Sequence, residues 1–75
     1  MADRVYRFWL ILSSEQVLSY YQGLVKSVVV QAESGLKVQL DLYHFRSYFQ
    51  HNGLNARFEL ITDSRGKFKA LKKIN

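Results

Sequence analysis

The sequence predicts an α+β domain that is mostly β, with five short, mainly antiparallel strands and one capping helix. Three observations lead to this prediction. Apolar and polar residues alternate in several short segments, as they do in half-buried strands. One segment carries a helix start signal, and four glycines stand singly between the segments as turn formers. We therefore expect the order β-α-β-β-short helix-β-β, folded as a small half-open barrel or curled sheet.

The first element is a strand over residues 4–12, and both of its faces are apolar enough to enter a core. The face of this strand that points away from the expected core carries Arg7, Trp9 and Ile11. Since a small domain has one interior, only one face of this strand can be fully buried. The residues expected in the core are Tyr6, Phe8, Leu10 and Leu12.

A helix follows over about residues 14–21. Ser13 stands at its N-cap, and Gln16 lies three residues later, which is the spacing of a capping box. Gly23 is placed to end the helix in the left-handed conformation. The expected buried face of this helix consists of Val17, Leu18 and Tyr21.

Residues 25–33 and 36–42 are expected to form a β-hairpin. The first segment is rich in β-branched residues, and a Ser-Gly turn at residues 34–35 separates it from the second. The second segment alternates strictly, which predicts one wet face. Its inward residues are expected to be Leu36, Val38, Leu40 and Leu42.

The second half of the chain predicts a short helix and a second hairpin. Apolar residues in 42–49 recur at three- and four-residue steps, and Asn52-Gly53 can take positive φ in the turn that follows. Residues 54–62 form a strand whose inward residues are Leu54, Ala56, Phe58 and Leu60. Residues 67–74 suit either a helical turn or a strand. The turn chemistry before them favours the strand, with a bulge near Ala70.

Length and composition indicate one folded domain over residues 1–75 without a linker, with frayed ends at residues 1–3 and 75. The absence of cysteine excludes disulfides, thiol catalysis and thiolate metal sites. The longest apolar run, FWLIL, is far too short to span a membrane, and no leader is expected at the N-terminus. We expect a cytoplasmic protein that does not associate with membranes.

The ordered spacing of several aromatic residues and glycines resembles a family of small bacterial proteins known as domain of unknown function 2835. The likeness runs from about residue 6 to residue 74 and rests on Tyr20-Tyr21-x-Gly23, Gly35, Gly53, Phe58 and Phe68. The resemblance implies a short stand-alone bacterial protein with no accepted activity and no binding residues to carry over. It also implies that the apolar positions of the first strand are Tyr6, Phe8 and Leu10, with Trp9 on the outer face.

The net charge of +5 favours encounter with nucleic acid or an acidic protein. Most of the candidate basic residues lie at or beyond the last turn, so hairpin pairing would gather them on one edge. These residues are Arg57, Arg65, Lys67, Lys69, Lys72 and Lys73. They predict a groove for single-stranded nucleic acid or another polyanion. Alternatively, they are solvated lysines that discourage pairing between sheet edges.

The second candidate surface is formed by Arg7, Trp9 and Ile11. An outward tryptophan beside an arginine can anchor a protein partner or a second copy of the chain, or can stack on a base. In the alternative interpretation, the helix folds back over this face and buries Trp9.

No arrangement of nucleophile, base or metal ligands indicates an enzyme. The only histidines, His44 and His51, are seven residues apart, and no cysteine completes a metal site. We expect no cofactor and no small-molecule ligand. Two functions remain: a polyanion-binding module with a basic C-terminal hairpin, and a protein-interaction or self-associating module with an exposed Trp9.

Overall fold

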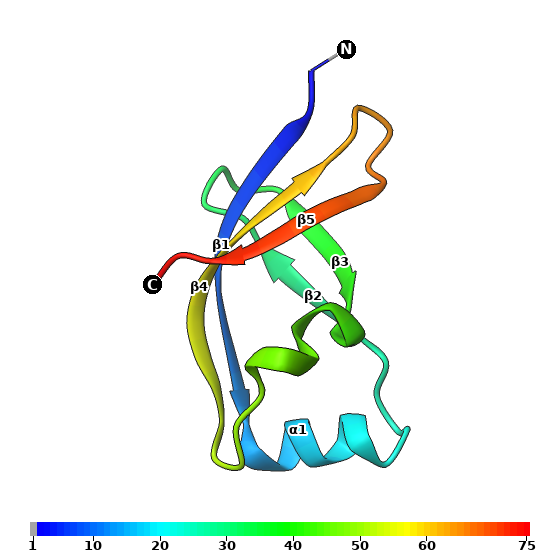
Figure 1. Ribbon diagram of the computed structural model, residues 1–75, viewed down its shortest axis with the longest axis vertical. Coiled ribbons are helices and arrows are strands. Elements are labelled where there is room, and N and C mark those ends of the chain that lie inside the picture. The colour runs from blue at the N-terminus through cyan, green and yellow to red at the C-terminus, as the bar shows by residue number, and fades with distance from the viewer. Residues whose placement is uncertain (1) are drawn as a thin grey trace.

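The computed structural model describes residues 2–75 and contains, within them, five strands and two helices (Figure 1). The elements are β1 (Arg4–Ser13), α1 (Ser14–Tyr21), β2 (Ser27–Gln31), β3 (Lys37–Asp41), the 3₁₀ helix η1 (Leu42–Tyr48), β4 (Gly53–Thr62) and β5 (Phe68–Lys73). The predicted α+β, mostly β class and the predicted order of elements are confirmed. Part of the fraying predicted at residues 1–3 falls on Met1, which lies outside the described residues.

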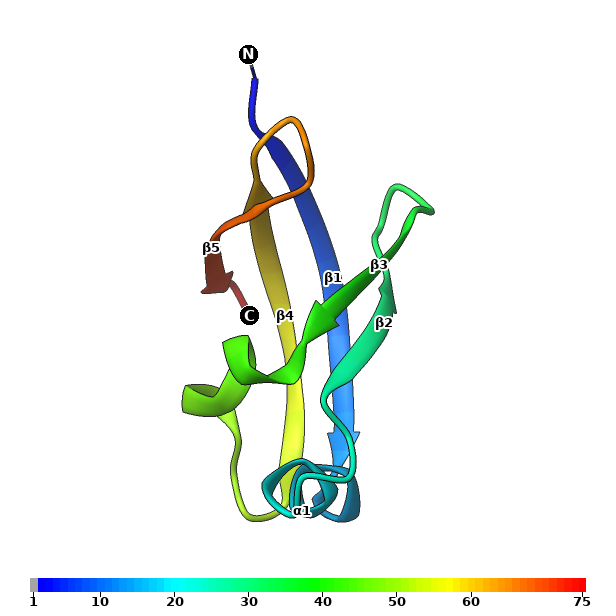
Figure 2. The same cartoon turned by 90° about the vertical axis from the view of Figure 1, so that its right-hand side faces the viewer.

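The strands form two antiparallel sheets. β4 lies between β1 and β5 in one sheet, and β2 pairs with β3 in the other. The Glu33 N–H donates to the Arg7 carbonyl oxygen at 2.7 Å, which ties the β2–β3 hairpin to the free edge of β1. Within residues 2–75 strand pairing joins neither β1 to β2 nor β3 to β5, so the half-open barrel is not closed (Figure 2).

The core lies between the two sheets, and it is built on the faces that alternation predicts. Phe8, Leu10 and Leu12 are buried on β1, and Tyr6 packs against them half-buried. All four predicted inward residues of β4 are buried as well. The other half of the core comes from the hairpin and the two helices: Val17, Val30, Leu40, Leu42 and Phe45. The predicted core face of the first strand is therefore confirmed.

Helix α1 begins and ends where the sequence predicts. The Ser13 side chain accepts a hydrogen bond from the Gln16 N–H, the Gln16 side chain accepts one from the Ser13 N–H, and Gly23 follows the helix with φ +77°. The predicted buried face is wrong in part, because Leu18 and Tyr21 are exposed. An eight-residue helix that covers only the end of the barrel buries one narrow stripe, and Val17 fills it (Figure 1).

The β2–β3 hairpin is confirmed, but one of its predicted inward residues is not. Leu36 is exposed because it precedes β3 in the turn, where its carbonyl oxygen accepts the Ala32 N–H. Gly35 takes φ +97° in that turn. Strand periodicity therefore begins one residue later than the alternation of the sequence suggests.

The last segment is a strand, as the turn chemistry favoured. β5 pairs with β4, and the register shifts where Ile61 faces Ala70 and Thr62 faces Phe68. Lys69 is therefore the extra residue of a bulge beside Ala70, as predicted. The Phe68 ring stacks on the His44 ring of η1, with centroids 3.9 Å apart and planes 5° from parallel.

Candidate functional site

The outer face of the β1–β4 pair exposes an indole at its centre. Trp9 is 51% exposed and Ile11 67% exposed, and Trp9 faces Arg57 across the strand pair. Helix α1 packs at the end of the sheet, so it does not fold back over this surface (Figure 1). The interpretation in which the helix buries Trp9 is therefore wrong. We call this surface, formed by Arg7, Trp9, Ile11, Arg57 and Glu59, the Trp9 face.

Two ion pairs flank the indole. Arg7 Nε lies 3.1 Å from Glu59 Oε2 across the β1–β4 pair. Arg57 binds Glu33 in a bidentate manner, with Nε to Oε2 and Nη2 to Oε1 both at 2.6 Å. Glu33 reaches this position because its own N–H is bonded to the β1 backbone. The Trp9 face thus carries paired charges of both signs around an apolar centre.

The Arg57 hydrogen bond lowers the pKa of Glu33, and the nearby charges of Arg57 and Arg7 act in the same direction against partial desolvation. A carboxyl whose pKa is lowered on folding stabilises the fold above its ordinary value of 4.5, and this stabilisation is lost as the pH falls through the lower folded-state value. We expect the Tm of the Glu33→Gln variant to fall less than that of the wild type when the pH is lowered through this range. Thermal unfolding of both proteins from neutral to acid pH tests this, and superimposable pH profiles would contradict it.

The six basic candidate residues do not gather on one surface. Arg57 is paired with Glu33, and Lys69 Nζ lies 2.9 Å from Asp3 Oδ2. Arg65 and Lys67 lie in the β4–β5 turn, where their N–H groups donate to Asp63 Oδ1 at 2.8 and 2.9 Å. These two bonds, that of Lys67 first, lower the pKa of the Asp63 carboxyl.

The remaining two lysines lie on opposite faces of β5. Lys72 faces Glu59 across the strand pair, on the outer side, whereas Lys73 faces the buried Phe58. The six basic residues, predicted to share one edge, are thus divided between the outer face, the inner face and the β4–β5 turn. Sequence reasoning placed the residues on the correct hairpin but could not assign their faces.

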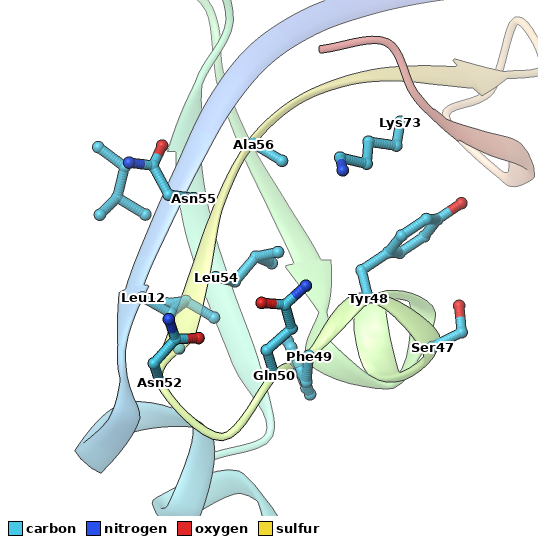
Figure 3. Close-up of a pocket in the computed structure, with 12 residues that line it drawn as sticks. Leu12, Ser47, Tyr48, Phe49, Gln50, Asn52, Leu54, Asn55, Ala56 and Lys73 are labelled. Atoms are coloured by element: carbon cyan, nitrogen blue, oxygen red, sulfur yellow. The ribbon is translucent and has the colours of Figure 1, made fainter.

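A cavity of about 510 Å³ opens beside the first half of β4. It lies between η1, the turn that joins η1 to β4, and the end of β5. Leu12, Leu54 and Ala56 supply apolar surface, and Gln50 and Lys73 supply polar groups (Figure 3). The lining contains one cation and no carboxylate among the described residues. The sequence alone does not predict this cavity. Lys73 lies in its lining only because of the register in which β5 pairs with β4.

No group of three or more residues able to hold a metal ion occurs within residues 2–75. His44 is stacked on Phe68, and His51 is exposed in the turn before β4. Neither helix in this part of the chain is long and apolar enough to cross a membrane.

No curated protein and no solved structure matches the sequence. The family model described as protein of unknown function (DUF2835) matches residues 4–74, which is nearly the whole chain. The resemblance noted from the spacing of aromatic residues and glycines is confirmed, and the chain belongs to the DUF2835 family.

Proposed function

We propose that the protein is a non-enzymatic interaction module that associates with a second copy of itself through the Trp9 face. The observation that carries this proposal is the half-exposed indole of Trp9 in the middle of a paired sheet. Aromatic side chains at the centre of a surface are the usual anchors of protein interfaces. Ile11 extends the apolar centre along β1, and both residues stand on a strand that β4 holds over its whole length.

The charges around Trp9 favour a second copy as the partner. Arg7 and Arg57 alternate on this face with Glu59 and Glu33, so each copy presents both signs. Two such faces related by a two-fold axis are self-complementary, because the arginines of one copy can approach the carboxylates of the other. A surface that matched only a polyanion would lack these carboxylates.

The same carboxylates disfavour nucleic acid as the ligand of this face. A phosphate backbone beside Trp9 would meet Glu33 and Glu59, and Arg57 would have to leave its bidentate partner. Lys69 is engaged with Asp3, which directly precedes β1. Dividing the basic residues between surfaces also weakens the continuous positive track that sequence-tolerant binders use. Self-association is therefore favoured over the polyanion-binding alternative.

Trp9→Ala is expected to weaken self-association by about 30-fold or more, the effect of losing a central aromatic anchor. Sedimentation equilibrium over a dilution series measures the dissociation constant, and far-UV circular dichroism shows that the variant is folded. Trp9 lies outside the core, so the fold is expected to persist.

The matched control is Leu36→Ala, which removes a side chain of similar exposure from the tip of the β2–β3 hairpin. We expect its dissociation constant to equal that of the wild type. A wild-type protein that stays monomeric at every concentration, or a Trp9→Ala variant that associates normally, would refute the proposal.

A further inference from the structure

Within residues 2–75, the edge of β4 that faces away from β1 has backbone hydrogen-bond partners before and after one residue, but none at that residue. At its start, Gly53 exchanges two backbone hydrogen bonds with Gln50, at 2.9 and 3.1 Å. Further along, the Arg57 carbonyl oxygen accepts the Ile74 N–H at 2.8 Å, and the Arg57 N–H donates to the Asn75 carbonyl oxygen at 3.3 Å. Two separate segments of the chain thus flank this edge.

Asn55 lies between these paired positions. In an antiparallel strand, alternate residues direct their N–H and C=O groups to the same side, so Asn55 shares the direction of Gly53 and Arg57. The strand pairing of β5 ends where Lys73 faces Phe58, and within residues 2–75 no strand partner covers Asn55 on this side. One donor and one acceptor of the backbone are therefore presented together.

The cavity described above opens at the same edge. Figure 3 shows the Lys73 ammonium and the Gln50 carboxamide directed into one space, beside Ala56 and Leu54. Lys73 makes no ion pair with any residue that the structure describes. A ligand that pairs with Asn55 would therefore meet apolar surface and a free cation, and the cavity lining has no acidic side chain among the described residues.

We propose that this edge binds an extended, acidic peptide segment of a partner protein, which pairs with the backbone of Asn55 and directs a carboxylate to Lys73. A peptide has an N–H and a C=O at strand spacing and can satisfy both groups of Asn55, as in other cases of strand addition. A phosphodiester chain offers no comparable donor. Four residue steps separate Gly53 from Arg57, about 14 Å, which leaves room for about three ligand residues.

The test uses the peptide acetyl-EVE-amide and the full-length protein labelled with ¹⁵N. We expect saturating peptide to slow hydrogen exchange at the Asn55 amide at least tenfold and to shift its resonance. The same peptide with an N-methyl group on its central valine is expected not to bind, because it cannot donate the required hydrogen bond. Unchanged exchange at Asn55, or equal binding of the N-methylated peptide, would overturn the proposal.

Charge recognition is tested with two lysine variants. Lys73→Gln is expected to weaken peptide binding about threefold to fivefold, as for loss of an exposed ion pair. Lys72→Gln removes the neighbouring charge from the other face of β5 and is expected to bind as the wild type does. Equal weakening by both variants, or displacement of the peptide by mixed-sequence single-stranded RNA, would show general polyanion attraction and overturn the proposal. Equal binding of acetyl-KVK-amide would show that the edge does not recognise an acidic side chain, and would overturn it as well. Trp9→Ala is expected to leave peptide binding unchanged.

Discussion

Gly53→Ala is expected to lower the free energy of unfolding by about 3 kcal/mol or more, through backbone strain and a clash. Gly53 has φ +111°, a conformation that residues with a Cβ rarely adopt. An added Cβ would press on the Leu12 carbonyl oxygen and would lie 3.1 Å from the Ser13 carbonyl carbon. Both are backbone atoms of β1 and its end, so relief would require the β1–β4 pairing to shift.

The matched control for this substitution is Gly35→Ala. Gly35 also has positive φ, +97°, but an added Cβ would meet nothing within 4 Å. Its expected cost is therefore the conformational penalty alone, about 1 to 2 kcal/mol. Urea unfolding followed by far-UV circular dichroism measures both variants. Equal losses would show that the contact with Leu12 is relieved without cost.

A loss of this size matters because the whole domain is small. A stability of about 0.05–0.15 kcal/mol per residue gives a chain of this length about 4–11 kcal/mol in total. Gly53 faces Ser13 at the end of the register in which all ten residues of β1 face β4. The loss expected for Gly53→Ala is therefore about a quarter to three quarters of the total stability, and the loss expected for Gly35→Ala is smaller.

The long strands and the helix start could be predicted because their signals are local. The alternation in β1 and β4 selects the buried side of each strand directly, and Phe8 and Phe58 are both on the predicted side. The capping box at Ser13 is complete within four residues. In the turn before β4, by contrast, the sequence allows positive φ at both Asn52 and Gly53, and Gly53 alone adopts it.

The exposure of surface residues could not be predicted in the same way, because it depends on what packs next to them. Leu18 and Tyr21 have the spacing of a buried helix face, yet α1 meets only the end of the barrel. Trp9 stays exposed for the same reason, since α1 does not reach the outer face of the sheet.

The candidate sites depend on still longer-range geometry. Arg57 and Glu33 are 24 residues apart and meet only because the β2–β3 hairpin reaches the edge of β1. The bulge at Lys69 decides which face each later residue of β5 occupies, and it places Lys73 on the side of the cavity. Composition predicted the basic character of the hairpin, but only the register shows where each charge points.

Phe58→Ala is the second substitution for which we expect a large effect, a loss of about 3–5 kcal/mol in the free energy of unfolding. Phe58 is completely buried on β4. Its ring packs edge-on against Phe45 and Tyr48, with centroids 5.0 and 5.2 Å away, and lies 6.0 Å from the Phe8 ring. Removing it leaves a cavity where β1, β4 and η1 meet, and this junction also holds one wall of the cavity near Lys73.

Two further variants separate the volume of Phe58 from its ring contacts. Phe58→Leu keeps most of the volume and is expected to lose clearly less stability than Phe58→Ala, because the residual cavity is smaller. Phe68→Ala removes an equal ring from a half-buried position, where His44 is its stacking partner, and is expected to cost less as well. Urea midpoints of the three variants rank them. If Phe68→Ala proved as destabilising as Phe58→Ala, the stack of Phe68 on His44 would contribute as much as the buried ring of Phe58, and the expected ranking would be wrong.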